Sequence, residues 1–486
     1  MNILFLSSEI APFAKSGGLA DVLGALPFAL KEKGENVKVM MPLYSSVQKE
    51  KYHIKKLYDN ACVQMGNCQE FFSVYSTSQP QGVDAYFIEF NKYFDRNGLY
   101  DDKFTREEYK DNAFRYAFFC KAALQTAQDI GFCPDILHVN DWQTALVPYL
   151  LKKEKNPFFA KTQSVLTIHN IGYQGVYDSA VLEYAGIDRR DFYPDTFEDY
   201  GRVNLLKGGI AFADKITTVS PKYAQEILEY PGGMGLEFLL QKRKADLTGF
   251  LNGVDIKEWN PSLDRRIKYN YDLKTFKEGK KKNKADVQDF FYLEKNDKPL
   301  FSMVARLVSQ KGVSLLADCL EPILNTMECQ IVIVGSGEAG VQNYFSSLCT
   351  KYLGKFGCYI GYREDLAHQV EAGSDFFMMP SLYEPCGLNQ MYSQIYGTLP
   401  IVRGTGGLED TVSNYNEQTG TGTGFKFYDI SSKAFYNTVG WANATYYDRP
   451  NHIEKMIKQA MRQDFSWNKS AELYIGLYRE LYARTH

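Results

Sequence analysis

The segment NILFLSSEIAPFAKSGGLAD (residues 2–21) joins a short apolar run to a loop that contains paired glycines. Its first part, Ile3–Ser8, predicts a buried strand, because a short continuous apolar run suits a strand that is covered on both faces. The residues that follow the glycines, Ala20–Lys31, predict a helix. A strand, a glycine loop and a helix in this order are typical of the start of a doubly wound α/β domain.

Further apolar runs, separated by helical patterns, repeat this arrangement along the chain. In the first half they are Val37–Leu43, Ala85–Phe90, Ile136–Val139, Val165–His169 and Ile216–Ser220. In the second half they are Leu300–Arg306, Ile331–Gly335, Cys358–Tyr362, Phe376–Ser381 and Ile401–Arg403. Two such series predict two doubly wound domains, each with a parallel sheet covered on both faces by helices.

The break between the two series falls near Leu251–Pro261, so we assign domains to residues 1–250 and 251–465 and a terminal helix to 466–486. A lysine-rich segment follows the break. We interpret it as a solvated helix face, with a glucan or phosphate contact as the alternative; its lysines are Lys280, Lys281, Lys282 and Lys284.

Composition excludes several classes of protein. The 486 residues carry a net charge of −3, which provides no positive field for nucleic acid. The start of the chain lacks the features of a signal peptide, and no apolar run is long enough for a membrane span. The nine cysteines form no C-x-x-C pair, so reduced thiols in a cytoplasmic protein are expected.

In open α/β sheets, ligands bind beyond the carboxyl ends of the strands, and the unusual residue clusters of this chain lie there. After the first strand, Lys15, Gly17 and Gly18 precede a predicted helix, an arrangement that suits an anion. The spacing matches neither a dinucleotide fingerprint nor a Walker loop. A phosphate-binding loop of another type is therefore indicated, and the alternative is a simple strand-to-helix turn.

Seven motifs occur in the order that characterises bacterial glycogen synthases and plant starch synthases. The chain resembles that family over nearly its whole length. The motifs are KSGGL (15–19), HVNDWQ (138–143), TIHN (167–170), LNGVD (251–255), ARLVSQKG (305–312), PSLYEPCGL (380–388) and GTLPIVRGTGGL (397–408).

The resemblance implies two facing Rossmann-like domains with a deep cleft between them, the GT-B fold, and a last helix that crosses back to the first domain. It implies a retaining glucosyltransferase that moves glucose from ADP-glucose to the non-reducing end of an α-1,4-glucan. The partners are then a nucleotide sugar and a glucan, with neither nucleic acid nor a membrane. The oligomeric state and the choice between ADP-glucose and UDP-glucose stay open.

The resemblance also implies the site residues. The catalytic group is Glu384, Arg306, Lys311, His169 and Lys15. Donor and nucleotide contacts are expected from Lys15, Gly17, Gly18, Asp21, Asn252, Arg306, Lys311, Tyr362, Cys386, Gly387, Leu388, Thr405, Gly406 and Gly407. Acceptor contacts are expected from Asp141 and Trp142, and Tyr362 is expected to stack on adenine. Many related transferases carry a second glutamate at the position of Tyr392, so the ribose contacts are left open.

The chemistry of the reaction supports these assignments. Negative charge grows on the departing phosphate, and Arg306 and Lys311 follow a predicted strand where cations could meet it. No histidine spacing suggests a metal site, and we expect no metal and no pyridoxal phosphate. No carboxylate is an obvious nucleophile at C1, so we expect front-face substitution with retention rather than a covalent intermediate.

Other interpretations stay in view. Each residue also has a structural alternative: His169 and Trp142 could be buried core residues, and Glu384 a helix cap. Rival functions are a sucrose or trehalose synthase, a glycogen phosphorylase and a non-catalytic glucan-binding relative. A dinucleotide dehydrogenase is disfavoured because neither half carries the fingerprint after its first strand.

Overall fold

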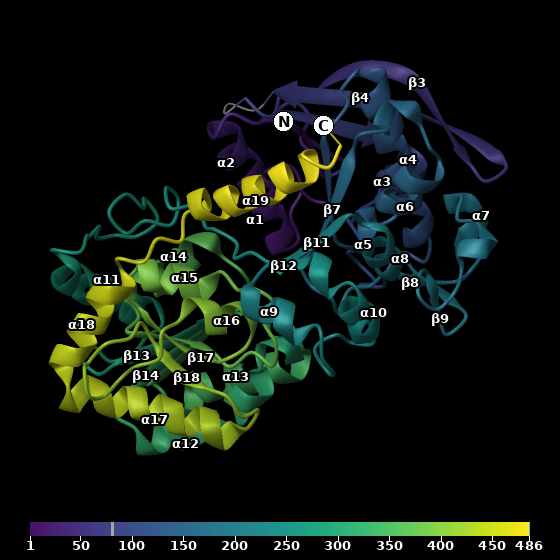
Figure 1. The fold of residues 1–486 in the computed structure, drawn as a ribbon. Coiled ribbons are helices and arrows are strands. Elements are labelled where there is room, and N and C mark those ends of the chain that lie inside the picture. Colours follow the sequence, from purple (N-terminus) through teal and green to yellow (C-terminus); the bar gives the residue numbers. More distant parts are fainter. Residues whose placement is uncertain (79–81, 486) are drawn as a thin grey trace. The chain divides into compact units, whose positions relative to one another are not determined.

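The computed structural model describes residues 1–78 and 82–485, and the chain folds into two compact units. The first unit comprises Met1–Gly253 together with Trp467–His486, and the second comprises Val254–Ser466. Figure 1 shows strands sandwiched between helices in each unit. Among the described helices, none has the length and apolar character needed to cross a membrane.

The first unit is built on a mixed sheet with the order β12-β11-β7-β6-β1-β2-β5-β4-β3. Its parallel strands are β1 (Asn2–Leu6), β2 (Asn36–Pro42), β5 (Asp84–Glu89), β6 (Ile136–Asn140), β7 (Gln163–Ile168), β11 (Lys215–Thr218) and β12 (Leu247–Gly249). Strand β1 pairs in parallel with β2 on one side and with β6 on the other, so successive strands are added on opposite sides of β1. Loops that follow β1 and β6 therefore meet at a topological switch point, where doubly wound sheets bind ligands.

The prediction of a purely parallel sheet was wrong at one edge of this unit. A long hairpin, β3 (Lys55–Met65) and β4 (Cys68–Ser78), adds two antiparallel strands next to β5. Its tight turn holds Gly66, whose φ of +54° lies in the region that favours glycine. A smaller antiparallel sheet also forms, from β8 (Val176–Tyr177), β9 (Glu198–Asp199) and β10 (Arg202–Asn204).

The helices of the first unit differ from the prediction after the glycine loop. The single helix expected over Ala20–Lys31 is two helices, which are interrupted between Leu23 and Leu26. Gly24 lies in the interruption, where a Cβ would be only 3.0 Å from the backbone oxygen of Ala11. The helices are α1 (Gly18–Leu23), α2 (Leu26–Glu32), α3 (Asn91–Phe94), α4 (Asn112–Asp129), α5 (Asp141–Thr144), α6 (Val147–Lys153), α7 (Val181–Ala185), α8 (Leu205–Phe212), α9 (Pro221–Glu226), α10 (Glu237–Lys242) and α19 (Trp467–Tyr482).

Helix α19, the last of the chain, belongs to the first unit and packs against α2 and β6. The imidazole of His138 in β6 lies 2.6 Å from the hydroxyl of Tyr478 in α19. The other nitrogen of that ring lies 2.5 Å from the hydroxyl of Thr167 in β7. Burial lowers the pKa of His138 to about 3, so the ring is neutral and joins the sheet to α19 without an ionic interaction.

The second unit is a parallel sheet in the order β15-β14-β13-β16-β17-β18. The strands are β13 (Leu300–Val304), β14 (Gln330–Gly335), β15 (Phe356–Ile360), β16 (Phe376–Met379), β17 (Leu399–Arg403) and β18 (Phe425–Phe427). This is the strand order of dinucleotide-binding Rossmann domains, with the switch point between β13 and β16. The loops that carry the A-R-L-V-S-Q-K-G and E-P-C-G-L motifs follow these two strands.

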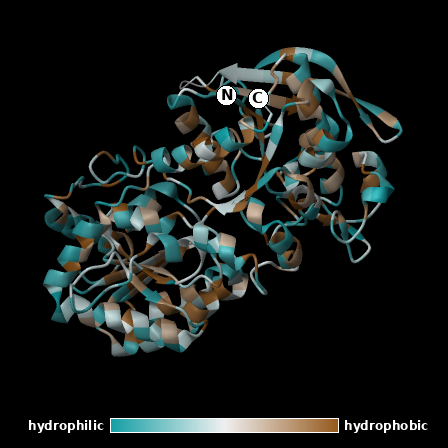
Figure 2. Cartoon of the chain, in the orientation of Figure 1, coloured by the Kyte–Doolittle hydropathy of each residue, from teal (hydrophilic) through white to brown (hydrophobic). Residues whose placement is uncertain are grey.

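Helices cover both faces of this sheet. Along β13 the side chains alternate: Phe301 and Met303 join one apolar cluster, whereas Leu300 and Val304 join the other. Figure 2 shows hydrophobic strands in the interior and alternating hydropathy along α17. The helices are α11 (Phe276–Phe290), α12 (Val313–Thr326), α13 (Ala339–Lys351), α14 (Glu364–Gly373), α15 (Asn389–Ile395), α16 (Gly406–Thr411), α17 (Ser432–Asp448) and α18 (Pro450–Ala460).

The lysine-rich segment forms α11, and its interpretation as a solvated face was half wrong. Lys281 and Lys282 are exposed, but Lys280 and Lys284 are buried against α14 and the strand ends. The ammonium of Lys280 donates to the carbonyl oxygens of Ala372 and Tyr396 and to the hydroxyl of Thr398. Burial lowers the pKa of Lys280 to about 7. Lysine spacing alone did not distinguish the buried side of this helix from its solvated side.

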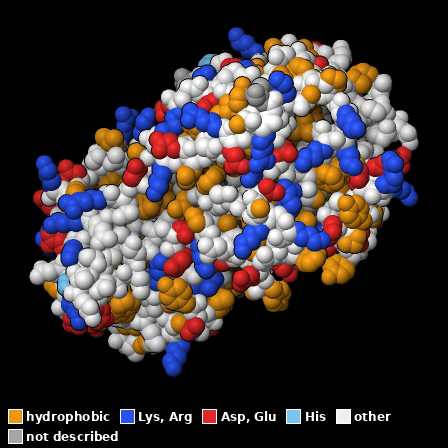
Figure 3. Space-filling view, in the orientation of Figure 1, with side chains coloured by type: hydrophobic (Ala, Val, Ile, Leu, Met, Phe, Trp, Pro, Cys, Tyr) orange, Lys and Arg blue, Asp and Glu red, His pale blue; other side chains and the backbone are white. Residues whose placement is uncertain are grey.

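Surface charge agrees with the small net charge of the chain. On the face drawn in Figure 3, basic and acidic side chains are interspersed. The face shown in Figure 3 therefore has no extended basic patch of the kind that binds a polyanion.

Candidate active site

The loop after β1 is organised by a carboxylate that sequence analysis did not single out. Glu9 is buried, and its carboxylate accepts hydrogen bonds from the backbone N–H of Ser16, the Ser16 hydroxyl (2.7 Å) and the N–H of Gly17 (3.3 Å). The Tyr100 hydroxyl donates to the same carboxylate at 2.7 Å. Two N–H groups of the predicted phosphate loop are therefore already bonded to Glu9.

The rest of this loop is open. Gly17 and Gly18 are exposed, and a Cβ at either position would meet nothing within 4 Å. Gly17 has an extended φ of −154°, so the absence of side chains here leaves room rather than relieving strain. The ammonium of Lys15 is 2.6 Å from the carboxylate of Asp21, and both side chains are partly exposed. This ion pair holds a lysine over a backbone that a ligand can approach closely.

Asp141, the first residue of α5 directly after β6, has an unusual backbone conformation. Asp141 has a φ of +54°, which is uncommon for a residue other than glycine and is tolerated best by Asp and Asn. Its carboxylate accepts the backbone N–H of His169, at the end of β7, at 2.7 Å. Burial raises the pKa of Asp141 to about 7, although hydrogen bonds from the backbone of His169 and Asn170 oppose the shift. Asp141 thus positions the His169 loop.

The hydrogen-bond network fixes the tautomer of His169. The Asn140 side chain donates through Nδ2 to the carbonyl oxygen of Leu6, so its Oδ1 faces the His169 ring. Nε2 of His169 lies 2.9 Å from that oxygen and is therefore the protonated nitrogen. Burial lowers the pKa of His169 to about 3. The ring is neutral, with a lone pair on Nδ1.

Trp142, a predicted acceptor contact, is buried within the first unit. Its indole is 6% exposed and contacts the rings of Tyr116 and Tyr177 at centroid distances of 5.3 and 5.4 Å. Gly175, with a φ of +66°, has no room for a side chain because a Cβ would lie 2.4 Å from the indole. Asn252, also predicted as a donor contact, is buried near the end of this unit.

In the second unit, the structure brings Lys311 and Glu384 together at the switch point. The Lys311 ammonium lies 2.6 Å from Oε2 of Glu384, which also accepts the Ser381 hydroxyl at 3.0 Å. The two charged side chains are 19% and 7% exposed. Arg306 follows β13, and its side chain is exposed. One cation thus supports a buried carboxylate, whereas the other points to solvent.

Glu384 does not cap a helix, and Pro385, a residue type suited to a first helical turn, does not begin one, because α15 begins at Asn389. The intervening residues Glu384–Leu388 form a loop in which Gly387 has a φ of +72°. Buried Gln390 supports that loop by donating to the carbonyl oxygens of Cys386 and Gly387. The backbone N–H groups of residues 384–388 therefore belong to a loop and not to the first turn of α15.

The second G-G-L loop packs directly on this segment. The N–H of Gly407 donates to the carbonyl oxygen of Glu384 at 3.1 Å. A Cβ on Gly406, where φ is +45°, would lie 1.9 Å from that oxygen, and one on Gly407 would lie 2.0 Å from the Cys386 oxygen. Both glycines are needed for this close approach. Thr405 is the buried residue at the start of α16.

Aromatic residues near the predicted nucleotide position divide into two groups. Tyr362, the predicted adenine platform, is 68% exposed just after β15. Tyr392 is buried and stacks on Trp259 at a centroid distance of 3.7 Å. Trp259 stacks in turn on His368, also at 3.7 Å. Tyr392 therefore belongs to an aromatic stack in the core of the unit, where it occupies the position of the second glutamate of related transferases.

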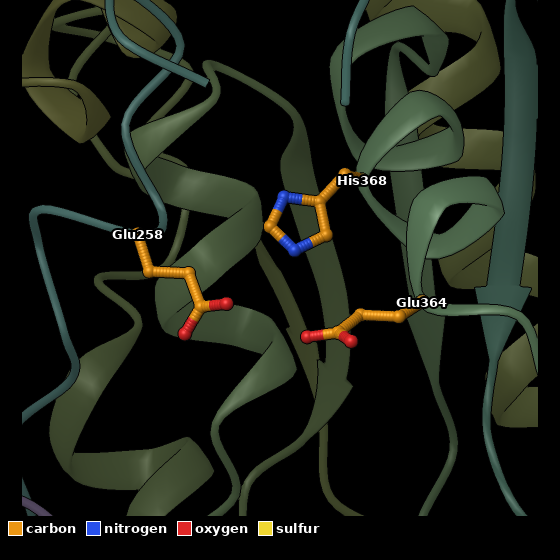
Figure 4. Close-up of side chains that lie close together, drawn as sticks. All are labelled: Glu258, Glu364 and His368. Carbon is orange, nitrogen blue, oxygen red and sulfur yellow. The ribbon is translucent and has the colours of Figure 1, made fainter. Parts of the chain in front are cut away.

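One cluster in the second unit has the ligand types of a metal site. Glu258, Glu364 and His368 offer atoms that lie within 4.8 Å of one another. Figure 4 shows the three side chains close together. However, the guanidinium of Arg266 donates to Glu258 at 2.8 Å and to Glu364 at 3.3 Å. The protein thus supplies a positive charge to both carboxylates, and Nδ1 of His368 is bonded to Asp264 at 2.7 Å. We interpret the cluster as an ion-pair network.

Comparisons with known proteins agree with the motif pattern. Residues 2–242 match the family model described as starch synthase catalytic domain, and residues 285–459 match that of glycosyl transferases group 1. A glycogen synthase of Treponema denticola is 45% identical over 99% of this chain and 98% of its own length. A glycogen synthase of Thermotoga maritima is 41% identical over 100% of this chain and 99% of its own.

Solved structures agree as well. The catalytic domain of starch synthase IV from Arabidopsis thaliana, bound to ADP and acarbose, matches with a TM-score of 0.90 and 32% identity over 99% of both chains. A sucrose-phosphate synthase from Thermosynechococcus elongatus matches with a TM-score of 0.60 at 18% identity, which shows a shared fold alone. The two-domain α/β fold expected from the sequence is confirmed; the roles of the individual site residues stay predictions.

Proposed function

This chain belongs to the glycogen and starch synthase family of glycosyltransferases, and we propose that it transfers glucose from ADP-glucose to the non-reducing end of an α-1,4-glucan with retention of configuration. The single observation that carries the donor half of the proposal is the Lys311–Glu384 pair at the switch point of the second unit. The relative solved with ADP and acarbose supports a nucleotide and a glucan as ligands.

The leaving group explains the cations. When the bond between C1 and the phosphate oxygen breaks, negative charge develops on the diphosphate, and fixed cations aimed at it lower the barrier. Lys311 is held in place by Glu384, so it is preorganised for this task. Arg306 is exposed in the same switch-point loop, and its guanidinium group can form bidentate hydrogen bonds with the diphosphate. We assign donor-phosphate binding to both.

The sugar side of the reaction needs a different environment. Positive charge develops at C1, and in this proposal Glu384 binds a glucose hydroxyl and stabilises that charge. His169 is neutral and cannot repel the developing cation, which suits a residue beside the transferred glucose. The glucan hydroxyl attacks from the face that the diphosphate leaves, and the leaving phosphate oxygen takes its proton. Trapping of a glucosyl-enzyme adduct by mass spectrometry would contradict this front-face route.

The proposal includes no resident metal and no prosthetic group. Arg306 and Lys311 supply the positive charge at the diphosphate that a divalent ion supplies in other enzymes. A cytoplasmic location is part of the proposal, and the nine cysteines, all of which lie in the described residues, form no disulfide in the structure.

The choice of donor is tested by initial rates with ADP-glucose and UDP-glucose at equal concentration and with glycogen as acceptor. We expect transfer from ADP-glucose to dominate. Equal rates would keep the enzyme class and remove adenine selectivity. Binding of glycogen without transfer from either donor would favour the non-catalytic glucan-binding alternative.

Tyr362 has a matched test. If its ring stacks on adenine, Tyr362→Ala should raise KM for ADP-glucose about 5- to 150-fold, the range expected for loss of ~1–3 kcal/mol of base stacking. Tyr292→Ala is the control, because that ring is 83% exposed in the same unit but lies outside every motif. Equal KM values in the two variants would remove Tyr362 from the nucleotide site.

A further inference from the structure

Two thiols of the second unit lie next to each other outside the residues assigned to the reaction. Cys349 is in the last turn of α13, and Cys358 is in β15. Their Sγ atoms are 3.4 Å apart, within hydrogen-bonding distance for sulfur. Both side chains are half-buried, so a small reagent can reach them.

We propose that Cys349 and Cys358 form a redox modification site, at which a peroxide converts the two thiols into a disulfide that joins α13 to β15. The proposal does not depend on the identity of the sugar donor. It concerns the cysteines that the motif analysis left unassigned.

The geometry requires only a small movement. A disulfide has a sulfur–sulfur distance of about 2.05 Å, so the two sulfur atoms must approach by roughly 1.3 Å from 3.4 Å. Rotation of two half-buried side chains supplies such a shift more easily than movement of the backbone. The two residues lie on adjoining elements, since α13 packs on β15.

The pair is also chemically poised. The hydrogen bond between the two thiols lowers the pKa of Cys349 below that of an ordinary thiol, although burial opposes the shift. The same interaction, together with burial, raises the pKa of Cys358. Cys349 is therefore the nucleophile and Cys358 the resolving thiol. Burial raises the pKa of Cys120 and of Cys329 to about 12, so these thiols are far less reactive.

Hydrogen peroxide oxidises the two thiols in two steps. The Cys349 thiolate attacks one peroxide oxygen, the O–O bond breaks, and hydroxide leaves and is protonated to water, which produces a sulfenic acid on Cys349. The Cys358 sulfur, on losing its proton, then attacks the Cys349 sulfur. The S–O bond breaks, and the departing hydroxide takes up that proton to form a second water. Two thiols are oxidised by two electrons, and one hydrogen peroxide molecule is reduced to two waters.

The test treats the reduced full-length chain with one equivalent of hydrogen peroxide, blocks the remaining thiols by alkylation, and digests with trypsin and a glutamate-specific protease. The sequence places each cysteine in its own peptide, 339–351 and 356–363. We expect these peptides to be joined, two hydrogen atoms lighter than their sum, and to be released by dithiothreitol. Cys349→Ser and Cys358→Ser should abolish the link.

Cys68→Ser is the matched control, because Cys68 is an exposed thiol on β4 of the other unit and should have no effect on the link. Each serine variant is compared with the wild type by circular dichroism and by its melting temperature, so that a failure to fold is recognised. Two results overturn the proposal: a trapped sulfenic acid on Cys349 without a link to Cys358, or a link that forms only when the chain is unfolded in guanidinium.

Discussion

Substitution of Arg306 or Lys311 by alanine should reduce glucose transfer to a similar extent, but only the Lys311 variant should lose much stability. Each variant removes a cation from the proposed diphosphate site, so each should lose roughly 10²-fold or more in turnover, which corresponds to about 2.7 kcal/mol of transition-state stabilisation. The two side chains differ in their surroundings. Arg306 is exposed, whereas Lys311 is bonded at 2.6 Å to a carboxylate that is only 7% exposed.

The stability difference follows from that burial. Without Lys311, the Glu384 carboxylate keeps the Ser381 hydroxyl at 3.0 Å but loses the ammonium that balances its charge. Breaking a fully buried pair costs about 3–5 kcal/mol, and the partial exposure of Lys311 reduces the expected loss to about 2–4 kcal/mol. Arg306→Ala should change the free energy of unfolding by less than about 0.5 kcal/mol, as exposed substitutions generally do.

The assay combines initial rates of glucose transfer with urea unfolding for wild type and both variants. Lys282→Ala is the control, because Lys282 is an exposed lysine on α11 that pairs with Glu278 one helical turn away. In the Lys311→Ala, Glu384→Ala double variant, part of the lost stability should return, since no charge is left buried. Equal stability losses at Arg306 and Lys311, or near-wild-type turnover in both, would refute the reasoning.

The remaining predictions concern the two glycine loops and the Asp141 turn. Glu9→Gln should cost about 2–4 kcal/mol, because the amide nitrogen cannot accept the Ser16 and Tyr100 hydroxyls as Oε1 of Glu9 does, and Tyr100→Phe should cost about 1 kcal/mol; urea unfolding measures both. Gly406→Ala should cost more than about 2 kcal/mol, since its Cβ would overlap the Glu384 oxygen, whereas Gly340→Ala on α13, with nothing within 4 Å, should be neutral or stabilising. Burial raises the pKa of Asp141 from 3.8 to about 7, so its contribution to stability is full below pH 3.8 and is lost as pH rises to about 7. Wild type should therefore lose stability relative to Asp141→Asn between about pH 4 and pH 7, and a constant difference would argue against the burial of this carboxyl. Transfer should persist after dialysis against EDTA, and loss of activity that Mg²⁺ restores would contradict the assignment of phosphate charge to Arg306 and Lys311.

The sequence predicts the central strands of both sheets because they are continuous apolar runs, which can be recognised without knowledge of the tertiary structure. The hairpin β3–β4 was missed because its strands carry many polar residues, such as Lys55, Asp59 and Gln69. Gly66-Asn67 between two β-rich segments is a turn signal that could have found it. The break at Gly24 was missed because a glycine within an apolar periodic segment is tolerated in many helices.

The site was predicted only where a motif carried it. Lys311 and Glu384 were both named, but their ion pair spans 73 residues and follows from the switch point of the sheet. Glu9 stands in the first quoted segment, yet its role became visible only when its carboxylate was found beneath the loop at Ser16 and Gly17. Asn140, which sets the tautomer of His169, gives no signal in the sequence beyond its place in a motif.

The central claim is tested most directly by incubating the purified chain with glycogen and ADP-glucose that is labelled in the glucose. The product is then digested with β-amylase, which removes maltose from the non-reducing ends of α-1,4-glucans. We predict that the label enters glycogen and that β-amylase releases it as maltose, which would establish both the position and the retained configuration of the new bond. Label that stays out of glycogen, or that enters it in a form resistant to β-amylase, would contradict the proposed reaction.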